Sequence, residues 1–323
     1  MSTKLPKISL ITLSYNSREK LPLLLASLRQ QTFQDFELVV VDNASVDDSV
    51  TWIRQQQIFP VTTVLENQTN LWYAKGNNQA WLHCRGEFII FCNDDVRLSP
   101  NCLAELVHGI EQDDRIAIVG GKLLRPVVAG AQPIIDSAGL TIRRNRQVTN
   151  RGENQIDTGQ YNTAGDVFGI SGALLCARRS ALEDTQQSGA VFDVDFVAYK
   201  EDVDLSWRIH RAGWRVCYLP KAVAYHGRTI QASQLRNRKN KSKLIRAMSY
   251  RNHWWTVIKN DDQVSFWRDA IWIIPYECAK LLYLCLAEWS TLAVIPELIR
   301  GIPVMRRRRI PGRGDPIHLW IKT

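Results

Sequence analysis

The chain of 323 residues is 45% hydrophobic and 23% charged, a composition typical of a globular protein and long enough for one large domain, an appendage and a substantial core. Its net charge of +9 is unevenly placed, because residues 228–323 carry 18 Lys and Arg against 7 Asp and Glu, whereas residues 1–227 carry 23 against 25. A uniformly basic protein is thereby excluded, and a basic extension over 228–323 is predicted.

The seven cysteines are odd in number and include no Cys-x-x-Cys pair. This pattern favours reduced thiols in a cytosolic compartment over a disulfide framework or a zinc site. Residues 1–7 are polar, and the apolar run 8–14 is too brief for the core of a signal peptide. We therefore expect a protein that is not exported.

Strands and helices alternate along the first ninety residues. The apolar runs 8–14, 36–41, 61–65 and 87–92 are typical of buried strands. Leu21, Leu24, Leu25 and Leu28 lie at helical spacing and predict a first helix. A second helix is expected to have an acidic first turn at 47–48 and to reach residue 57, and a third is expected over 74–84. This alternation with short links predicts an α/β fold with a mainly parallel sheet flanked by helices.

Adjacent carboxylates follow the fourth strand in the run Asn93-Asp94-Asp95. In open α/β sheets, ligands bind in the crevice outside the carboxyl ends of the strands, so we expect Asp94 and Asp95 to face that crevice. A divalent cation on a diphosphate suits such hard oxygen ligands. The alternative is that Asn93 and Asp94 shape a turn and that Asp95 caps a helix beginning near 99–100.

Asp42 ends the second strand at the same edge of the sheet. Its carboxylate can accept hydrogen bonds from a nucleobase or a ribose, or it can form an Asx turn into the next helix. No Gly-x-Gly-x-x-Gly follows the first strand and no P-loop motif is present, which disfavours dinucleotide-binding and P-loop folds. Beyond Gly121 the pattern is irregular, which predicts functional loops before a strand over 168–176.

The run 199–213 predicts a helix with acids at its N-terminus. Leu205, Ile209 and Ala212 form its apolar face, Asp204 and Arg208 pair at i,i+4, and Gly213 suits its C-terminal cap. Glu201 and Asp202 occupy the first turn, where a carboxylate either stabilises the helix dipole or acts as a general base. A strand over 214–219 follows, and then His226, which alone is more often structural than a ligand.

These pieces resemble, in order and spacing, family 2 inverting glycosyltransferases with the GT-A fold. The matching runs are Val39–Ser45, Asn93–Val96, Ser171–Ala173, Glu201–Arg208 and His226. The sequence is most similar to the bacterial rhamnosyltransferase-like branch, which it also resembles at Asp136–Gly139 and Asp157–Tyr161. The resemblance implies a GT-A catalytic domain over residues 1–227.

The resemblance also implies an activity and its residues: metal-dependent transfer, with Mg²⁺ or Mn²⁺, from dTDP-rhamnose or a UDP-hexose to a hydroxyl of a cell-surface glycan or a lipid-linked acceptor. Asp202 is implied as catalytic base with Glu201 as second candidate, and Asp95 and His226 are implied as metal ligands. Nucleotide-sugar contacts are expected from Thr12, Tyr15, Asn16, Asp42, Asn43, Trp72, Lys75, Asn77, Asn93 and Asp94, and acceptor contacts from Gly172, Ala173 and Trp207. Trp72 replaces a Gly that is usual in the family, and it is expected to narrow the donor pocket.

The extension 228–323 is expected to be helical. Glu277, Lys280 and Glu288 interrupt its apolar run, so no uncharged stretch approaches the roughly 18 residues of a spanning helix. One helical face is apolar and the opposite face is polar: Cys278, Leu281, Leu282, Cys285, Trp289 and Leu292 against Glu277, Lys280, Glu288 and Thr291. Beside a polybasic cluster this predicts an interfacial helix on anionic lipid at the inner face of the plasma membrane. The alternative is a helix that packs on the catalytic domain or on a second subunit.

Two other functions remain as alternatives. A nucleotidyltransferase shares the α/β plan and the metal acids, but its glycine-rich phosphate loop is missing at residues 14–17. A non-catalytic nucleic-acid or membrane-binding protein accounts for the basic extension, although no nucleic-acid motif accompanies the charge. We expect no nucleic-acid partner, and homo-oligomerisation stays open.

Overall fold

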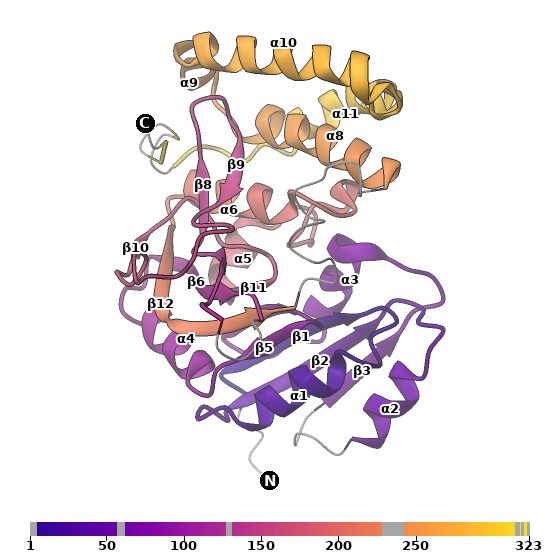
Figure 1. Ribbon diagram of the computed structural model, residues 1–323, viewed down its shortest axis with the longest axis vertical. Coiled ribbons are helices and arrows are strands. Elements are labelled where there is room, and N and C mark those ends of the chain that lie inside the picture. The colour runs from indigo at the N-terminus through magenta and orange to yellow at the C-terminus, as the bar shows by residue number, and fades with distance from the viewer. Residues whose placement is uncertain are drawn as a thin grey trace.

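The computed structural model describes residues 5–56, 62–126, 131–227 and 242–313, with residues 317, 320 and 321. Figure 1 shows the chain with its elements labelled. The strands are β1 (Ile8–Ser14), β2 (Phe36–Asp42), β3 (Thr62–Glu66), β4 (Phe88–Asn93), β5 (Val96–Leu98), β6 (Ile116–Leu124), β7 (Ile135–Ser137), β8 (Leu140–Ile142), β9 (Val148–Asn150), β10 (Gly165–Asp166), β11 (Leu174–Arg178) and β12 (Arg215–His226). The helices are α1 (Leu21–Arg29), α2 (Ser49–Gln55), α3 (Trp72–Trp81), α4 (Cys102–Ile110), α5 (Arg179–Thr185), α6 (Glu201–Arg211), α8 (Lys243–Asn260), α9 (Gln263–Arg268), α10 (Ala270–Ala287) and α11 (Ile295–Arg307), with short 3-10 helices η1 (Val194–Phe196) and η3 (Trp289–Val294).

The central sheet is mostly parallel, as predicted. Its strand order is β10-β12-β6-β11-β4-β1-β2-β3, with β5 paired to β12 and β7 to β6. Strand β1 runs parallel to β2 and β4, and its register places Ser14 opposite Asp42 and Leu13 opposite Asn93. The carboxyl ends of these three strands therefore meet at one edge, where Asp42 and Asn93 both lie.

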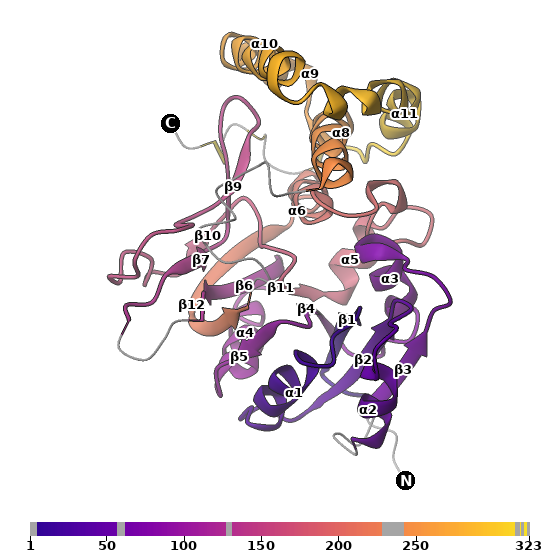
Figure 2. The same ribbon diagram turned by 45° about the vertical axis from the view of Figure 1, so that its right-hand side comes forward.

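Helices cover both faces of the sheet (Figure 2). On one face α1 and α4 bury Leu24, Leu28 and Leu106 against the strands. On the other face α3, α5 and α6 contribute Ala74, Ala181, Leu205 and Ile209 to a second core layer. Strand residues alternate between these two layers, which explains why the strands are apolar throughout.

Several predicted boundaries differ from the structure. Helix α3 begins at Trp72 rather than at 74, and the predicted strand 168–176 is displaced to Leu174–Arg178. Phe168 and Ile170 are apolar because they pack in the core, not because they belong to the sheet. The expected ends at residues 57 and 61 lie outside the described residues.

Strand β12 is longer than the predicted 214–219 and ends at His226. Past Leu219 the ladder with β6 skips Pro220 and the two residues after it, and resumes at Val223. This register shift accommodates the proline, which has no N–H for the ladder. The continuation carries His226 to a place opposite Val96 of β5.

Helix α6 agrees with its predicted pattern. Leu205 and Ile209 are fully buried, and Arg208 Nε lies 2.9 Å from Asp204 Oδ2. Gly213 closes the helix with a φ of +91°, a conformation that glycine adopts without steric cost. Both acids of interest, Glu201 and Asp202, occupy its first turn.

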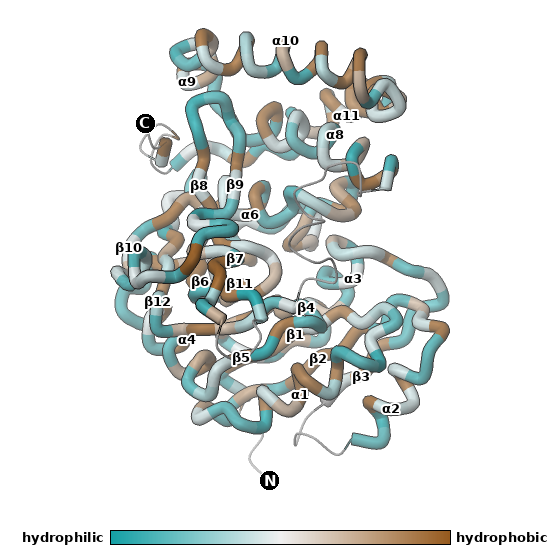
Figure 3. The backbone as a smooth tube through the Cα atoms, in the orientation of Figure 1, coloured by the Kyte–Doolittle hydropathy of each residue, from teal (hydrophilic) through white to brown (hydrophobic). Residues whose placement is uncertain are grey.

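The C-terminal helices pack against the rest of the chain at the α6 side. Helix α8 packs on α6, and α11 and η3 pack on α8. The hairpin β8–β9 projects from the central sheet toward α9 and α10 (Figure 1). Hydrophobic residues recur along α10 at the outer end of the molecule (Figure 3). Among the described residues, α10 is the one helix that is long and apolar enough, by length and composition, to cross a membrane.

Candidate active site

Asp94 and Asp95 lie in the turn between β4 and β5, at the sheet edge where they were expected. The alternative that Asp95 caps the next helix is wrong, because β5 begins at Val96 and α4 only at Cys102. The other part of that alternative, a turn after Asn93, is present in the structure. The contacts of the two carboxylates therefore decide their roles.

Asp95 belongs to a chain of four charged side chains. His226 Nε2 lies 3.3 Å from Asp95 Oδ1, and His226 Nδ1 lies 2.8 Å from Asp136 Oδ2. Arg125 Nε lies 3.5 Å from the other oxygen of Asp136. Burial opposes protonation of the imidazole, but the hydrogen bond to Asp136 and the negative charges of Asp95 and Asp136 outweigh it and raise the pKa of His226 to about 9.

The pair of Asp95 and His226 fits a divalent cation as two of its ligands. Asp95 Oδ1 is buried and, among the described residues, accepts no hydrogen bond of good geometry although it faces His226 Nε2. A buried carboxylate oxygen without a donor beside an imidazole nitrogen suits a metal ion. Asp136 would then hold the histidine from behind, as partners of metal-bound histidines do. The described residues contain no group of three or more His, Cys, Asp and Glu arranged as a complete metal site, so the substrate and water would supply the other ligands.

Asp94 faces a different environment. Its Oδ2 accepts a hydrogen bond from Ser17 Oγ, and Lys20 Nζ lies 3.6 Å away. Burial raises the pKa of Asp94 above its usual range, although Lys20 and Ser17 act in the opposite direction. Lys20 adds a positive charge at this edge, where a diphosphate is expected to bind.

Asp202 stands at the start of α6 with both carboxylate oxygens engaged by backbone groups. Gly172 N–H donates to Oδ2 at 3.1 Å, and Val203 N–H donates to Oδ1 at 2.8 Å. Gly172 is close-packed, since a Cβ added there would lie 2.8 Å from Tyr73 Oη and 3.5 Å from Asp202 Cβ. Tyr73 Oη in turn donates to Gly172 O at 2.8 Å. These contacts fix the direction in which the carboxylate points.

Glu201 is buried beside Asp202, and its Oε2 accepts no hydrogen bond among the described residues. Burial, with the charge of Asp202 as the second cause, raises the pKa of Glu201 to about 8. A carboxyl group with this pKa carries a proton at pH 7. Glu201 is therefore the poorer candidate for a base.

The segment before these acids is strained. Val197, Tyr199 and Lys200 have φ angles of +63°, +71° and +72°, a region that non-glycine residues rarely occupy. Asn252 of α8 holds the segment, because its Nδ2 donates to the carbonyl oxygens of Phe196, Ala198 and Tyr199 at 2.8–2.9 Å. The extension thus takes part in shaping the site.

Two residues of the expected nucleotide-sugar set carry informative geometry. Asp42 is 3% exposed, and its Oδ2 accepts the Ser45 N–H at 2.8 Å, so the Asx-type turn is present. Trp72 has a φ of +59°, which explains why glycine is usual at this position. The residue is 40% exposed at the start of α3. The carbonyl oxygen of Trp72 accepts from Asn43 Nδ2 at 3.3 Å.

The remaining predicted residues differ in accessibility. Tyr15 and Lys75 are exposed, and Asn16 Oδ1 accepts from Val46 N at 2.9 Å. Thr12 is buried in β1, and Asn77 Nδ2 donates to Tyr73 O at 3.0 Å within α3.

Of the expected acceptor contacts, only Gly172 touches Asp202. Ala173 is buried, and the ring of Trp207 is 2% exposed against Phe168 in a core cluster. A buried ring offers no surface to an acceptor, so we leave Trp207 out of the proposed contacts.

Sequence reasoning missed five residues that the fold brings to these groups: Ser17, Lys20, Tyr73, Asp136 and Asn252. The run Asp136–Gly139 resembled the family, and this was the one signal that pointed to Asp136. Lys20 directly precedes α1 and Asn252 lies within α8, and nothing in the sequence marks either residue.

Comparisons with known proteins agree with this geometry. The profile described as glycosyl transferase family 2 matches residues 9–185. An uncharacterized glycosyltransferase of Haemophilus influenzae is 35% identical over 112 residues, which are 35% of this chain and 37% of that protein. The N-acetylglucosaminyl-diphospho-decaprenol L-rhamnosyltransferase of Mycobacterium tuberculosis is 25% identical over 245 residues, 68% of this chain and 75% of that protein. Of the first three curated relatives, the chain spans only 27–37% of their length.

Solved structures establish the fold. The mannosyltransferase of Pyrobaculum calidifontis in complex with GDP-Man and Mn²⁺ has a TM-score of 0.57 at 18% identity, over 95% of this chain and 85% of that one. Residues 1–349 of Staphylococcus aureus TarS in complex with UDP-GlcNAc have a TM-score of 0.59 at 16% identity, over 94% of this chain and 82% of that one. The expected GT-A fold is confirmed, and the profile match favours glycosyl transfer over the nucleotidyltransferase alternative.

Proposed function

Since the chain belongs to glycosyl transferase family 2, we propose that it is an inverting transferase that moves a sugar from dTDP-rhamnose or a UDP-hexose to a hydroxyl of a cell-surface glycan or a lipid-linked acceptor. The observation that carries the proposal is the buried Asp95 oxygen that lacks a hydrogen-bond donor and faces His226 at the carboxyl edge of the sheet. Such a pair suits a cation-bound diphosphate. The names of the rhamnosyltransferase relative and of the neighbours with GDP-Man and UDP-GlcNAc support this donor class.

Asp95 and His226 would hold Mg²⁺ or Mn²⁺, which supplies charge neutralisation to the departing nucleoside diphosphate. Asp136 keeps the His226 ring in place at 2.8 Å, and Lys20 adds a second positive charge beside Asp94. The nucleoside would lie along the edge formed by Thr12, Tyr15, Asn16, Asp42 and Asn43. The sugar diphosphate would lie near Trp72, Lys75, Asn77, Asn93 and Asp94.

Asp202 is the proposed general base. It takes the proton of the acceptor hydroxyl while the oxygen attacks the anomeric carbon from the side opposite the diphosphate, so the anomeric configuration inverts. The Gly172 N–H and Tyr73 position the carboxylate. Glu201 is the second candidate, but its raised pKa leaves it protonated near neutral pH.

We also propose that the protein works in the cytoplasm at the inner face of the plasma membrane, with residues 228–323 on an anionic surface. The exposed apolar side of α10 supports this placement. The decaprenol-linked substrate in the name of the mycobacterial relative is of the kind that a membrane presents.

The deciding experiment is incubation of the full chain with dTDP-rhamnose and with individual UDP-hexoses, with and without Mn²⁺, after a thermal-shift screen of the same donors. Release of nucleoside diphosphate that depends on Mn²⁺ is expected. In a parallel incubation with a nucleoside triphosphate and a sugar 1-phosphate, release of pyrophosphate would identify a nucleotidyltransferase instead. Absence of stabilisation by every nucleotide sugar would refute the proposed donor class.

A further inference from the structure

Helix α10 buries its charged residue Glu277 together with the apolar Ile273 and Leu284, and exposes an apolar side. Glu277 is 8% exposed, with His253 Nε2 3.0 Å and Lys280 Nζ 3.3 Å from its Oε1. Glu288, just after the helix, accepts the Tyr283 hydroxyl at 3.1 Å and lies 3.5 Å from Arg246 Nε. Leu282 and Leu286 point outward and are 60% and 79% exposed. A helix on a water-facing surface has the opposite orientation.

The exposed apolar side extends beyond α10 at helical spacing into α9 and η3. We call these residues the outer stripe: Val264, Trp267, Ile271, Ile274, Leu282, Leu286 and Trp289. Soluble monomers rarely expose so continuous an apolar surface, which usually marks contact with a membrane or a protein.

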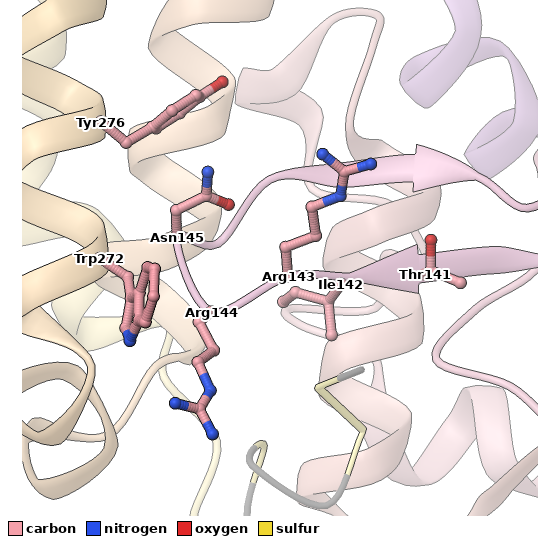
Figure 4. A pocket seen from close by; sticks show the side chains of 7 residues that line it. All are labelled: Thr141, Ile142, Arg143, Arg144, Asn145, Trp272 and Tyr276. Atoms are coloured by element: carbon pink, nitrogen blue, oxygen red, sulfur yellow. The ribbon is translucent and has the colours of Figure 1, made fainter. Parts of the chain in front are cut away.

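A cavity of about 730 Å³ opens beside the outer stripe, between the tip of the β8–β9 hairpin and α10 (Figure 4). Its polar lining includes Arg143, Arg144 and Asn145 from the tip, and its aromatic lining comes from Trp272 and Tyr276 of α10. The Arg144 guanidinium carbon lies 6.0 Å from the centre of the Trp272 ring. Within the described part of the chain, neither arginine has a carboxylate partner. Two exposed guanidinium groups beside aromatic rings match the chemistry of a lipid phosphate at a membrane interface.

The hairpin tip is held rigidly against the extension. The side chain of Arg146 is fully buried, with Nε 2.7 Å from Asp261 Oδ2 and Nη1 2.8 Å from Asp269 Oδ2. Its Nη1 also donates to Arg144 O at 2.8 Å. Because Arg146 satisfies both acids, Arg143 and Arg144 remain available to an external anion.

We propose that the outer stripe lies in the interfacial layer of a bilayer and that the cavity binds the phosphate head group of an anionic phospholipid. The inference deepens the membrane part of the proposed function and rests on it. Charge favours a bilayer over a second copy of the chain, because a two-fold contact would bring the same basic cavities together, whereas an anionic surface attracts them.

The outer stripe is tested first, by sedimenting the full-length protein with vesicles of phosphatidylcholine alone and with vesicles that also contain phosphatidylglycerol. The wild type should bind both, and the anionic vesicles more tightly at low salt. Leu282→Glu/Leu286→Glu should weaken binding to both kinds of vesicle by about 10-fold or more. Leu82→Glu is the matched control, because Leu82 is 75% exposed at the end of α3 and lies outside the outer stripe.

The cavity is tested with Arg143→Ala/Arg144→Ala. The variant should bind phosphatidylglycerol vesicles about 30-fold more weakly, the scale expected for two basic residues at an anionic surface, and phosphatidylcholine vesicles as the wild type does. Arg29→Ala/Arg54→Ala removes the same charge from exposed sites in α1 and α2 and should have little effect. The Leu282→Glu/Leu286→Glu and Arg143→Ala/Arg144→Ala variants should both bind a nucleoside diphosphate as the wild type does in calorimetry. This measurement separates failure of this inference from failure of the proposed transfer.

Four outcomes would overturn the inference. Wild-type affinity of the Arg143→Ala/Arg144→Ala variant for anionic vesicles would remove the cavity from lipid binding. Full-length protein that ignores both kinds of vesicle at low salt would remove the bilayer. A wild-type dimer that Leu282→Glu/Leu286→Glu makes monomeric would assign the outer stripe to a second copy. Inorganic phosphate that stabilises the wild type but not the arginine variant, without vesicle binding, would assign the cavity to a soluble anion.

Discussion

Asp202→Asn isolates the proposed proton transfer because the side chain keeps its shape. Asp202 accepts two backbone N–H groups, from Gly172 at 3.1 Å and from Val203 at 2.8 Å. An amide keeps one acceptor oxygen, so the loss of stability is that of a single hydrogen bond, about 1 kcal/mol. The loss of a general base is larger, about 10²–10⁴-fold in turnover, which corresponds to about 3–5 kcal/mol of activation free energy.

The assay is steady-state release of nucleoside diphosphate with Mn²⁺ and acceptor, combined with calorimetry of nucleoside-diphosphate binding. The kcat should fall while the affinity for nucleotide and metal stays near that of the wild type, because Asp202 is proposed to act only on the acceptor proton. A turnover within a few-fold of wild type would show that the carboxylate only supports its helix. The reasoning about the base would then be refuted.

Glu201→Gln is the matched control for this experiment. Because burial raises the pKa of Glu201 to about 8, the residue is already neutral at pH 7, and glutamine resembles that form. Turnover should therefore stay within a few-fold of wild type. The folded state of the wild type holds this proton more tightly than the unfolded chain, so wild-type stability should fall as pH rises from about 4.5 to about 8. The glutamine variant should lack that part of the decline in a pH series of melting temperatures.

Three further variants test other contacts. His226→Ala should raise the Mn²⁺ concentration needed for nucleotide binding. Asp136→Asn should lower the affinity for Mn²⁺ by about 10–100-fold, the usual scale for a partner of a metal-bound histidine. Unchanged Mn²⁺ titrations would remove the pair from the metal site. Asn252→Ala removes the side-chain amide that holds the carbonyl oxygens of residues 196, 198 and 199. The kcat should therefore fall more than the affinity for the nucleotide sugar, and equal effects on both quantities would point to general unfolding. Arg146→Ala leaves Asp261 buried without its arginine partner, while Asp269 keeps Arg268. The change should cost about 3–5 kcal/mol in denaturant unfolding, and a loss below 1 kcal/mol would show that water reaches Asp261.

The part of the fold that local pattern determines was predictable. Alternating apolar runs up to residue 93 gave the strands, and Asp204, Arg208 and Gly213 fixed α6. Errors arose where tertiary contacts override the pattern. Phe168 and Ile170 are buried without belonging to the sheet, and Pro220 is accommodated by a register shift that only the partner strand β6 reveals.

The candidate site was predictable only for residues that sit in recognisable runs. Asp95 and His226 come from segments 131 residues apart in sequence, and β5 beside β12 brings them within 3.3 Å. Lys20 and Asn252 have no local signature, and only the family-like run Asp136–Gly139 marked Asp136, since the roles of all three depend on what the fold places opposite them. A contact such as that of Asn252 with the strained segment before Glu201 exists only in three dimensions.

The extension shows most clearly why amphipathicity alone is ambiguous. An amphipathic sequence shows that the two faces of a helix differ in polarity, but it does not show which face is buried. The side of α10 that carries Glu277 is buried, with Ile273 and Leu284, because α8 offers His253 to Glu277. Just after the helix, α8 also offers Arg246 to Glu288. The same α8 holds the segment before Asp202 through Asn252. One helix therefore connects the apolar outer surface to the proposed base, and an acceptor carried by a membrane would reach the site from the side on which α8 and α10 lie.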